Sequence, residues 1–520
     1  MKIYEMTAYE MRKRLERGEL CSVEIVRALQ ERADQVEEHV NGFARQFREE
    51  ALRDARHADE ERSRGEARGP LHGLPLSVKE NIDTRGTATT LGLRARLGRR
   101  AERDAVIVRL AREAGAVLIG KSNVPQALLP MNCTNAVFGA TRNPWSPRHV
   151  TGGSSGGEGA LLASGESVLG LGTDLGGSIR FPASFCGVAG LKPTTWRWSN
   201  IGSSSPITGQ EFVVPQIGPM ARTSRDVAML LRGLDSPQHS RHDPQVPPLP
   251  IRDPDLVDFS KLRIGFYEDD GFIAPARSCR RAVREALTAL ERTGAQLIPM
   301  PLTNQREVVQ LYIGATSGDG MRSYRRALDG EPVVDSLRTI WRLGRLPLGV
   351  RRMGAKILRR MGEERLAAVI EASGEKSVAR LWELVARRNA LRVAENEVWQ
   401  VAGIHALVCP ASASPAVPIG MDKDFSIIFS YFGRYNLLGL PAAVVPVTRV
   451  RGDETDGLPR GDRIDRRAAA VAEQSQGLPV AVQVVGPAWR EDIVLAVMSA
   501  VEDHARTGEL FPLTPLDPVR

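Results

Sequence analysis

The chain has 520 residues, of which 42% are hydrophobic and 25% charged, with a formal net charge of +8 at pH 7. This composition is typical of a soluble globular protein and excludes disordered and fibrous classes. No run of about 18 apolar residues is present, which excludes a membrane-spanning helix, and the charged start lacks a signal-peptide core. The five cysteines are scattered and show no zinc-type spacing, which favours reduced thiols in a cytoplasm. We expect no metal and no cofactor.

The charge excess is confined to one segment. Residues 336–362 contain eight basic side chains and no acidic one, so the rest of the chain is close to neutral. Such a local imbalance favours a local electrostatic partner over a surface that binds nucleic acid. We therefore expect no nucleic-acid partner.

The first 70 residues predict a helical layer. Thr7 and Glu10 form a capping box, and an apolar stripe continues to a helix end near Asn41. The sequence pattern then changes at GLPLSVKENID. A helix over 105–114 and the short buried strand AVLIG follow this segment. Five prolines in 242–255 predict a linker between two halves.

Beyond that linker the pattern alternates again. Strand KLRIGFYEDD, a helix near 280–292 and strand AQLIPMPL are followed by a helical stretch over 337–400, and a charged insert at 451–467 separates the strands PAAVVPVT and GLPVAVQVVG. This alternation predicts an α/β fold with a sheet covered by helices on both faces. We expect a single domain over 1–520, with a helical layer (1–70), a catalytic core (71–240 and 400–515), a second-half α/β unit (256–335) and a basic amphipathic helical cap (336–400).

Three motifs resemble sites and fail on physical grounds. GAVLIGKS at 115–122 matches a phosphate loop by letter, but its four variable residues form a strand and not a turn. Gly152–Gly156 fits the nucleophile elbow G-x-S-x-G, but the segment before it contains two prolines and makes a poor buried strand. The eight histidines show no metal spacing. We expect surface or structural roles for them.

A lysine and two serine loops remain. Lys79 follows apolar residues in LSVKENID, and burial there would lower its pKa enough for it to act as a neutral base; a salt-bridged structural lysine is the alternative. Ser154 lies in TGGSSGGEGA, and Ser178 follows two glycines in GTDLGGSIR. Consecutive glycines let several N–H groups converge on one oxygen, as in an oxyanion hole. The combination favours Ser-Lys nucleophilic catalysis.

These motifs resemble those of the amidase signature family, in GGSSGG at 152–157, in 172–194, and in KENID around Lys79. The resemblance implies that family's mixed-sheet fold with a helical cap, and a Ser-Ser-Lys triad acting through an acyl-enzyme. It assigns Ser178 as nucleophile, Ser154 as a bridging serine after a cis peptide bond, and Lys79 as general base and then acid. The oxyanion donors would be the N–H groups of Leu175, Gly176, Gly177 and Ser178, supported by Ser155, Thr173, Asp174 and Arg180.

Within this family, residues 122–145 and Glu158 are most similar to the fatty acid amide hydrolases. This likeness implies long-chain fatty acyl amides as substrates, and we expect an acyl pocket at Leu128, Leu129, Met131, Phe429 and Phe432. Three alternatives stay open. They are the glutaminase subunit of a tRNA-dependent amidotransferase, an amidase for small or aryl amides, and a catalytically inactive member.

The basic stretch predicts two helices separated by Pro347. Apolar residues recur at helical spacing with basic residues between them, a pattern typical of a helix lying on an anionic membrane. A core-packed hairpin with a solvated basic face is the alternative. We expect a cytoplasmic protein held on the inner face of a membrane, with a homodimer as a further partner hypothesis. The cap residues would be Trp341, Val350, Met353, Ile357, Arg351 and Arg352.

Overall fold

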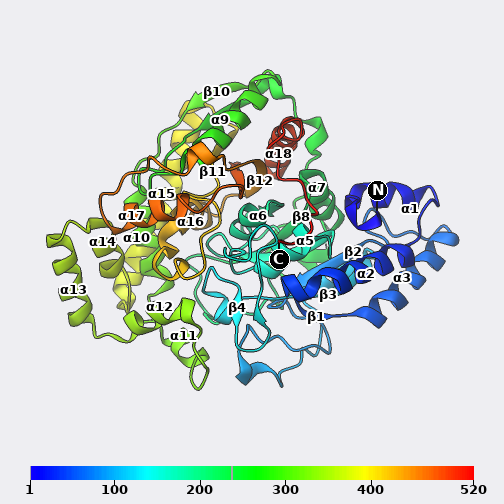
Figure 1. Ribbon diagram of the computed structural model, residues 1–520, viewed down its shortest axis with the longest axis horizontal. Coiled ribbons are helices and arrows are strands. Elements are labelled where there is room, and N and C mark those ends of the chain that lie inside the picture. Colours follow the sequence, from blue (N-terminus) through cyan, green and yellow to red (C-terminus); the bar gives the residue numbers. More distant parts are fainter. Residues whose placement is uncertain (1, 236–237, 520) are drawn as a thin grey trace.

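The computed structural model describes residues 2–235 and 238–519, and within them eleven strands form one mixed sheet (Figure 1). Across the sheet the strands are β1 (Phe43–Gln46), β3 (Val117–Ser122), β2 (Pro75–Lys79), β6 (Leu169–Asp174), β8 (Gln216–Ala221), β7 (Ala189–Lys192), β12 (Ala442–Arg449), β13 (Pro479–Val485), β11 (Ala406–Pro410), β9 (Arg263–Phe266) and β10 (Gln296–Pro299). A separate small hairpin pairs β4 (Thr134–Asn135) with β5 (Gly139–Ala140). The sheet therefore joins both halves of the chain.

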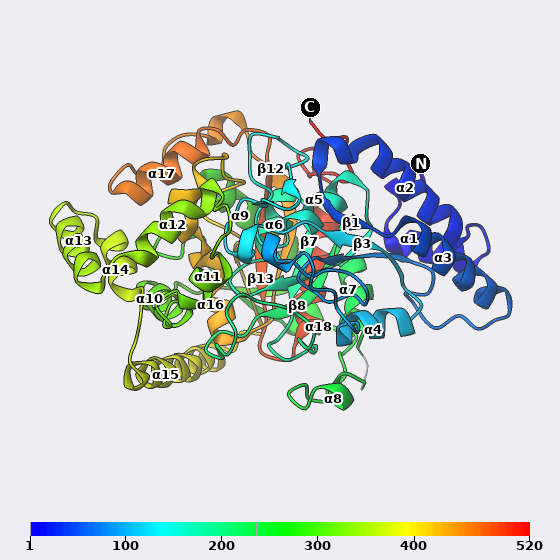
Figure 2. The same ribbon diagram turned by 90° about the horizontal axis from the view of Figure 1, so that it is seen from below.

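Helices cover both faces of this sheet, as the two views show (Figures 1 and 2). In chain order they are α1 (Ala8–Glu16), α2 (Ser22–Val40), α3 (Arg48–Ser63), α4 (Val106–Glu113), α5 (Gly156–Ser164), α6 (Arg180–Cys186), α7 (Ser224–Gly233), α8 (Gln238–His242), α9 (Arg277–Glu291), α10 (Gln305–Thr316), α11 (Arg322–Ala327), α12 (Asp335–Arg345), α13 (Leu348–Arg360), α14 (Glu364–Ala372), α15 (Val378–Ala402), α16 (Ser430–Leu438), α17 (Arg463–Ala472) and α18 (Glu491–Ala505). The predicted α/β class and mixed sheet are confirmed.

Local sequence signals explain several of these boundaries. The capping box at the start of α1 is present, because the Thr7 N–H donates to Glu10 and the Thr7 hydroxyl accepts from the Glu10 N–H. Helix α2 ends at Asn41, which adopts the left-handed conformation common after a helix. The phosphate-loop mimic is a strand, since Gly120, Lys121 and Ser122 all lie within β3. The prediction that this segment forms a strand and not a turn is confirmed.

The sheet brings the lysine and serine loops to one edge. Strands β2 and β6 are parallel neighbours, with Val78 opposite Leu171, so their carboxyl ends at Lys79 and Asp174 emerge together. Helix α5 begins directly after the first serine loop, and α6 begins directly after the second. Within the described ranges, no helix combines the length and hydrophobicity that crossing a bilayer requires.

Candidate active site

Lys79 is completely buried at the end of β2 and is surrounded by oxygen acceptors. Its Nζ donates to Ser154 Oγ at 2.7 Å and to Thr173 Oγ1 at 2.7 Å, and it also reaches the Thr173 carbonyl at 3.2 Å. The peptide bond between Gly153 and Ser154 is cis, as the sequence resemblance implied. A lysine that touches a hydroxyl in this way can exchange a proton with it.

The environment of Lys79 favours its neutral form. Burial lowers the pKa of Lys79 to about 7, because an ammonium removed from water loses its hydration, while nearby acidic groups, chiefly Asp174, oppose this shift only in part. A large share of Lys79 is therefore neutral near pH 7. In that state it can accept a proton from Ser154.

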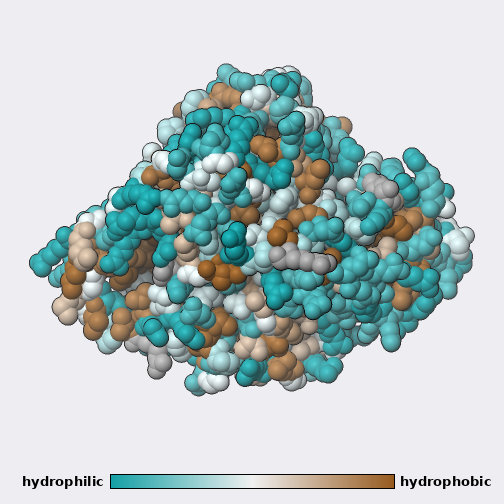
Figure 3. All heavy atoms as spheres, viewed as in Figure 1, coloured by the Kyte–Doolittle hydropathy of each residue, from teal (hydrophilic) through white to brown (hydrophobic). Residues whose placement is uncertain are grey.

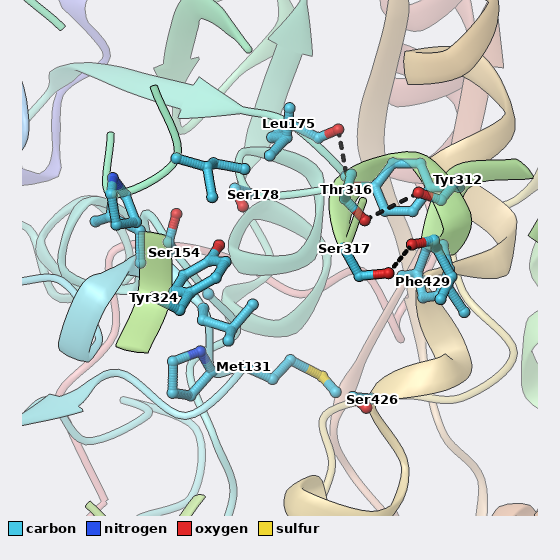
Figure 4. Close-up of a pocket in the computed structure, with 18 of the residues that line it drawn as sticks. Met131, Ser154, Leu175, Ser178, Tyr312, Thr316, Ser317, Tyr324, Ser426 and Phe429 are labelled. Carbon is cyan, nitrogen blue, oxygen red and sulfur yellow. Dashed lines mark hydrogen bonds between the residues drawn. The ribbon is translucent and has the colours of Figure 1, made fainter. Parts of the chain in front are cut away.

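Ser154 and Ser178 line the same cavity and are tied together through the backbone. The N–H of Ser155 donates to the Ser178 carbonyl at 3.0 Å, which holds the two loops against each other. Ser154 is nearly buried, with 3% of its surface exposed, whereas Ser178 is partly exposed to the cavity. In Figure 4 both serines lie on one side of the cavity, and Tyr312 and Phe429 lie on the other. A substrate in the cavity would thus meet Ser178 first.

The predicted oxyanion hole differs at one position. The N–H of Gly177 donates to Asp174 Oδ1 at 2.7 Å, so this donor is occupied by a carboxylate. Gly177 has a φ of +112°, a value that residues with a side chain rarely adopt, and in this conformation its N–H points toward Asp174. Among the described residues, none accepts a hydrogen bond from the N–H of Gly176 or Ser178. The N–H groups of Leu175, Gly176 and Ser178 remain predicted oxyanion donors.

Asp174 and Arg180 form a buried ion pair that shapes the second serine loop. Both side chains are inaccessible to solvent, and Arg180 donates to both Asp174 oxygens, at 2.9 and 3.0 Å. Burial would raise the pKa of Asp174, but the Arg180 charge and the hydrogen bonds from Arg180, Asn436 and Gly177 outweigh it and hold that pKa below its usual range. Arg180 also donates to Gln483 Oε1 at 2.6 Å. The pair therefore anchors the loop to β13.

Two further polar residues support the lysine. Ser155 Oγ contacts both the N–H and the carbonyl of Thr173 at 3.4 Å, which links the first serine loop to β6. Glu158 is completely buried on α5 and accepts a hydrogen bond of 2.5 Å from Ser77, which lies two residues before Lys79 on β2. Burial raises the pKa of Glu158 to about 7. The Glu158 carboxylate and Lys79 therefore influence each other's charge.

The cavity in front of the serines has a volume of about 360 Å³. Four of the five residues expected in an acyl pocket line it, namely Leu128, Leu129, Met131 and Phe429. Phe432 does not line it. Its ring packs on Phe181 at 4.5 Å between centroids and beneath the Arg180 guanidinium at 4.9 Å, so it belongs to the core behind the second serine loop.

Several lining residues were not anticipated, because they come from helices distant in sequence. Tyr312, Thr316 and Ser317 come from the end of α10, Tyr324 comes from α11, and Arg351 comes from α13 (Figure 4 shows the first four). Helical periodicity does not reveal which face of these helices meets the cavity. Within the described residues, no group of His, Cys, Asp and Glu side chains could hold a metal ion.

The predicted cap residues divide between two environments. Val350, Met353 and Ile357 are exposed on α13, with 47%, 61% and 52% of their surface accessible, and Arg352 is exposed beside them. Trp341 is half-buried and packs against the cluster containing Leu91, Leu93 and Tyr324. Arg351 is buried and faces the cavity, so it does not belong to the outer face.

The basic stretch also has acidic partners in three dimensions. Arg359 pairs with Glu371 at 2.6 Å, and Arg338 pairs with Asp335 at 3.3 Å. Folding therefore places carboxylates beside a segment that has none in sequence. These ion pairs weaken the local positive potential of the basic stretch.

The chain is similar to known amidases in sequence and in fold. The family model described as Amidase matches residues 24–495. The chain is 38% identical over 440 residues to fatty-acid amide hydrolase 1 of Sus scrofa, covering 84% of this chain and 76% of that protein. It is 29% identical over 522 residues to an acetamidase of Aspergillus oryzae, covering 96% of this chain and 90% of that protein. A solved fatty acid amide hydrolase structure gives a TM-score of 0.83 at 27% identity, over 97% of this chain and 85% of that chain. The protein therefore belongs to the amidase signature family and is an amide hydrolase.

Proposed function

We propose that the protein hydrolyses fatty acyl amides through a relay of Ser178, Ser154 and Lys79. Neutral Lys79 takes the Ser154 proton while Ser154 takes the Ser178 proton, and Ser178 Oγ attacks the amide carbon. The resulting oxyanion accepts hydrogen bonds from the N–H groups of Leu175, Gly176 and Ser178. The C–N bond then breaks, and the ammonium of Lys79 returns its proton through Ser154 to the departing amine.

The acyl-enzyme is then hydrolysed by the same groups. Water loses a proton through Ser154 to Lys79 as its oxygen attacks the acyl carbon, and the ester bond to Ser178 Oγ breaks with return of that proton to the serine. The observation that carries this proposal is the 2.7 Å contact between Lys79 and Ser154 at the wall of the cavity that Ser178 also lines. Any buried lysine needs hydrogen-bond acceptors, and the feature specific to Lys79 is that its serine acceptor lines the cavity.

The lining of the cavity supports an acyl chain as the bound group. Apolar side chains such as Leu129, Met131, Ile207 and Phe429 make up much of its wall. Burying each methylene of a chain against such a wall contributes about 0.8 kcal/mol. A glutamine or a small amide has too little apolar surface to use this wall. The likeness to a fatty-acid amide hydrolase supports the same substrate class.

We expect kcat/KM to rise with acyl length across a series from butyramide to hexadecanamide, by about fourfold for each added methylene that the cavity buries, because each contributes about 0.8 kcal/mol. Steady-state kinetics on the purified chain, with glutamine as a further substrate, measures this. Leu129→Gln should lower the value for the long amides and leave butyramide unchanged. Glutamine turnover exceeding that of every acyl amide would instead favour the amidotransferase-type function.

The exposed face of α13 supports delivery of such substrates from a membrane. Val350, Met353 and Ile357 lie on one side of the helix, with the basic residues Arg352 and Lys356 beside them. Figure 3 shows hydrophobic residues gathered at the end of the molecule where Figure 1 labels α13. Apolar side chains can enter the acyl boundary while each cation gains about 1 kcal/mol at anionic headgroups.

We expect the chain to sediment with vesicles that contain anionic phosphatidylserine, less with neutral vesicles, and less at high salt, because salt screens exposed charges. Replacing Val350, Met353 and Ile357 together by Asp should reduce binding at least tenfold. Val393, Val398 and Val401 are exposed on α15 and provide a matched control when replaced by Asp. If both triple variants sediment like the wild type, the α13 face is only a solvated surface.

A further inference from the structure

One buried arginine in the cavity wall has no role in the relay. Arg351 lies on the inward face of α13, one turn before the buried Ala355, and only 9% of its surface is exposed. It lines the same cavity as Ser154 and Ser178. It is the cationic member of a wall that is otherwise made of apolar and neutral polar side chains among the described residues.

The guanidinium of Arg351 lacks a partner within the part of the chain that the structure describes. Its Nε is buried without a hydrogen-bond acceptor, and no carboxylate lies within ion-pair distance of the side chain. Two other arginines of this region are paired, Arg359 with Glu371 and Arg365 with Asp462. A buried charge without a partner costs several kcal/mol, so such a group is a candidate for binding an anion.

The surroundings of Arg351 are basic. Burial lowers the pKa of Arg351, and the neighbouring charge of Arg325 lowers it further. Burial, followed by the charges of Arg351 and other arginines, lowers the pKa of Lys376 to about 8. Glu375, which follows Gly374 in the chain, pairs with Arg322, and Asp319 accepts from the N–H groups of Met321 and Ser323 at the start of α11.

The backbone makes room for the guanidinium. It packs over Gly374, in the turn between α14 and α15, where an added Cβ would collide with both terminal nitrogens of Arg351. Any larger residue at 374 would displace the guanidinium from its position. The nearby Ser317 hydroxyl, which accepts from the Gly374 N–H at 2.9 Å, also lines the cavity. The fold thus accommodates an arginine that no described protein group neutralises.

We infer that Arg351 is the carboxylate-binding residue of the substrate cavity, and that the enzyme acts on acyl amides that carry a carboxylate. The planar guanidinium can donate two parallel hydrogen bonds to both oxygens of a carboxylate. This inference rests on the proposed hydrolysis at Ser178. The carboxylate has two chemical sources, the far end of the acyl chain or the amine side of an N-acyl amino acid.

Two matched substrate pairs distinguish these sources. The first is the monoamide of dodecanedioic acid against dodecanamide, and the second is N-dodecanoylglycine against N-dodecanoylpropylamine. Arg351→Gln should lower kcat/KM for the carboxylate member of one pair by about 10- to 100-fold, since a hydrogen-bonded charge pair is lost. Its effect on the neutral members should stay below twofold. Arg351→Lys should retain part of the preference, and the affected pair identifies the source.

Arg360→Gln is the matched control, because this arginine of α13 is exposed and its replacement should leave every ratio unchanged. If the Arg351→Gln protein folds incompletely, kcat/KM falls for all four substrates together, and the two neutral substrates reveal this. Calorimetric binding of the dodecanedioic monoamide and of N-dodecanoylglycine to the Ser178→Ala and Ser178→Ala/Arg351→Gln proteins tests the subsite for both sources even if no amide is hydrolysed. Any of three results would overturn the inference. These are equal affinities of the two proteins for the carboxylate ligands, equal losses of kcat/KM for neutral and charged substrates, and lost vesicle binding with unchanged kinetic ratios.

Discussion

Replacing Ser178 by Ala should reduce kcat/KM for acyl amides by on the order of 10⁴-fold or more, because Ser178 supplies the attacking oxygen of the proposed relay and lines the cavity. The same change should abolish covalent labelling by a fluorophosphonate, which forms its bond with an activated serine. Rates of amide hydrolysis and mass spectrometry of the labelled protein measure the two effects.

Ser426 provides the matched control for this variant. It is another serine in the cavity wall, and Ser426→Ala should retain wild-type labelling and hydrolysis. Ser154→Ala should fall between the two, because the nucleophile remains and its connection to Lys79 is lost. Labelling of Ser178→Ala at the wild-type rate would remove Ser178 from the proposed role and leave the family membership intact.

The catalytic loops could be predicted from sequence because local chemistry determines them. Glycine pairs around Ser154 and before Ser178 permit tight turns, and the apolar residues before Lys79 predict that this lysine is buried. In the structure Lys79 and Ser154 are in contact, as the predicted Ser-Lys site requires. The occupied N–H of Gly177 was not predictable, because it depends on how the Asp174 side chain turns within its own loop.

The cavity wall was only partly predictable, because distant helices complete it. The spacing of Val350, Met353 and Ile357 correctly groups them on one face of α13, and all three are exposed. The same pattern gives no reason to separate Arg351 from Arg352, since α14 packs against α13 and determines which of them is covered. Phe432 was misassigned for a similar reason. An aromatic residue near the site in sequence can serve either the cavity or the core behind it.

Replacing Lys79 by Met should reduce kcat/KM by on the order of 10³-fold and leave the fold intact, because methionine fills a similar space and has no charge to bury. Circular dichroism and thermal unfolding check the fold. Lys121 is the matched control. It is a buried lysine on the adjacent strand with a pKa lowered to about 8 by burial, and its Nζ contacts Ala88 and Thr89 but no catalytic serine. The Lys121→Met protein should keep most of the wild-type activity.

The pH profile then identifies the group that titrates. Since burial lowers the pKa of Lys79 to about 7 and the neutral amine is the active form, kcat/KM should fall about tenfold per pH unit below 7 and level off above about 8. Glu158 has a pKa raised to about 7 and is the competing candidate. Its negative charge raises the pKa of Lys79, so Glu158→Gln should move the acidic limb to lower pH if Lys79 is the base. Loss of that limb in Glu158→Gln, with its persistence in Lys79→Met, would assign the titration to Glu158 and remove Lys79 as the base.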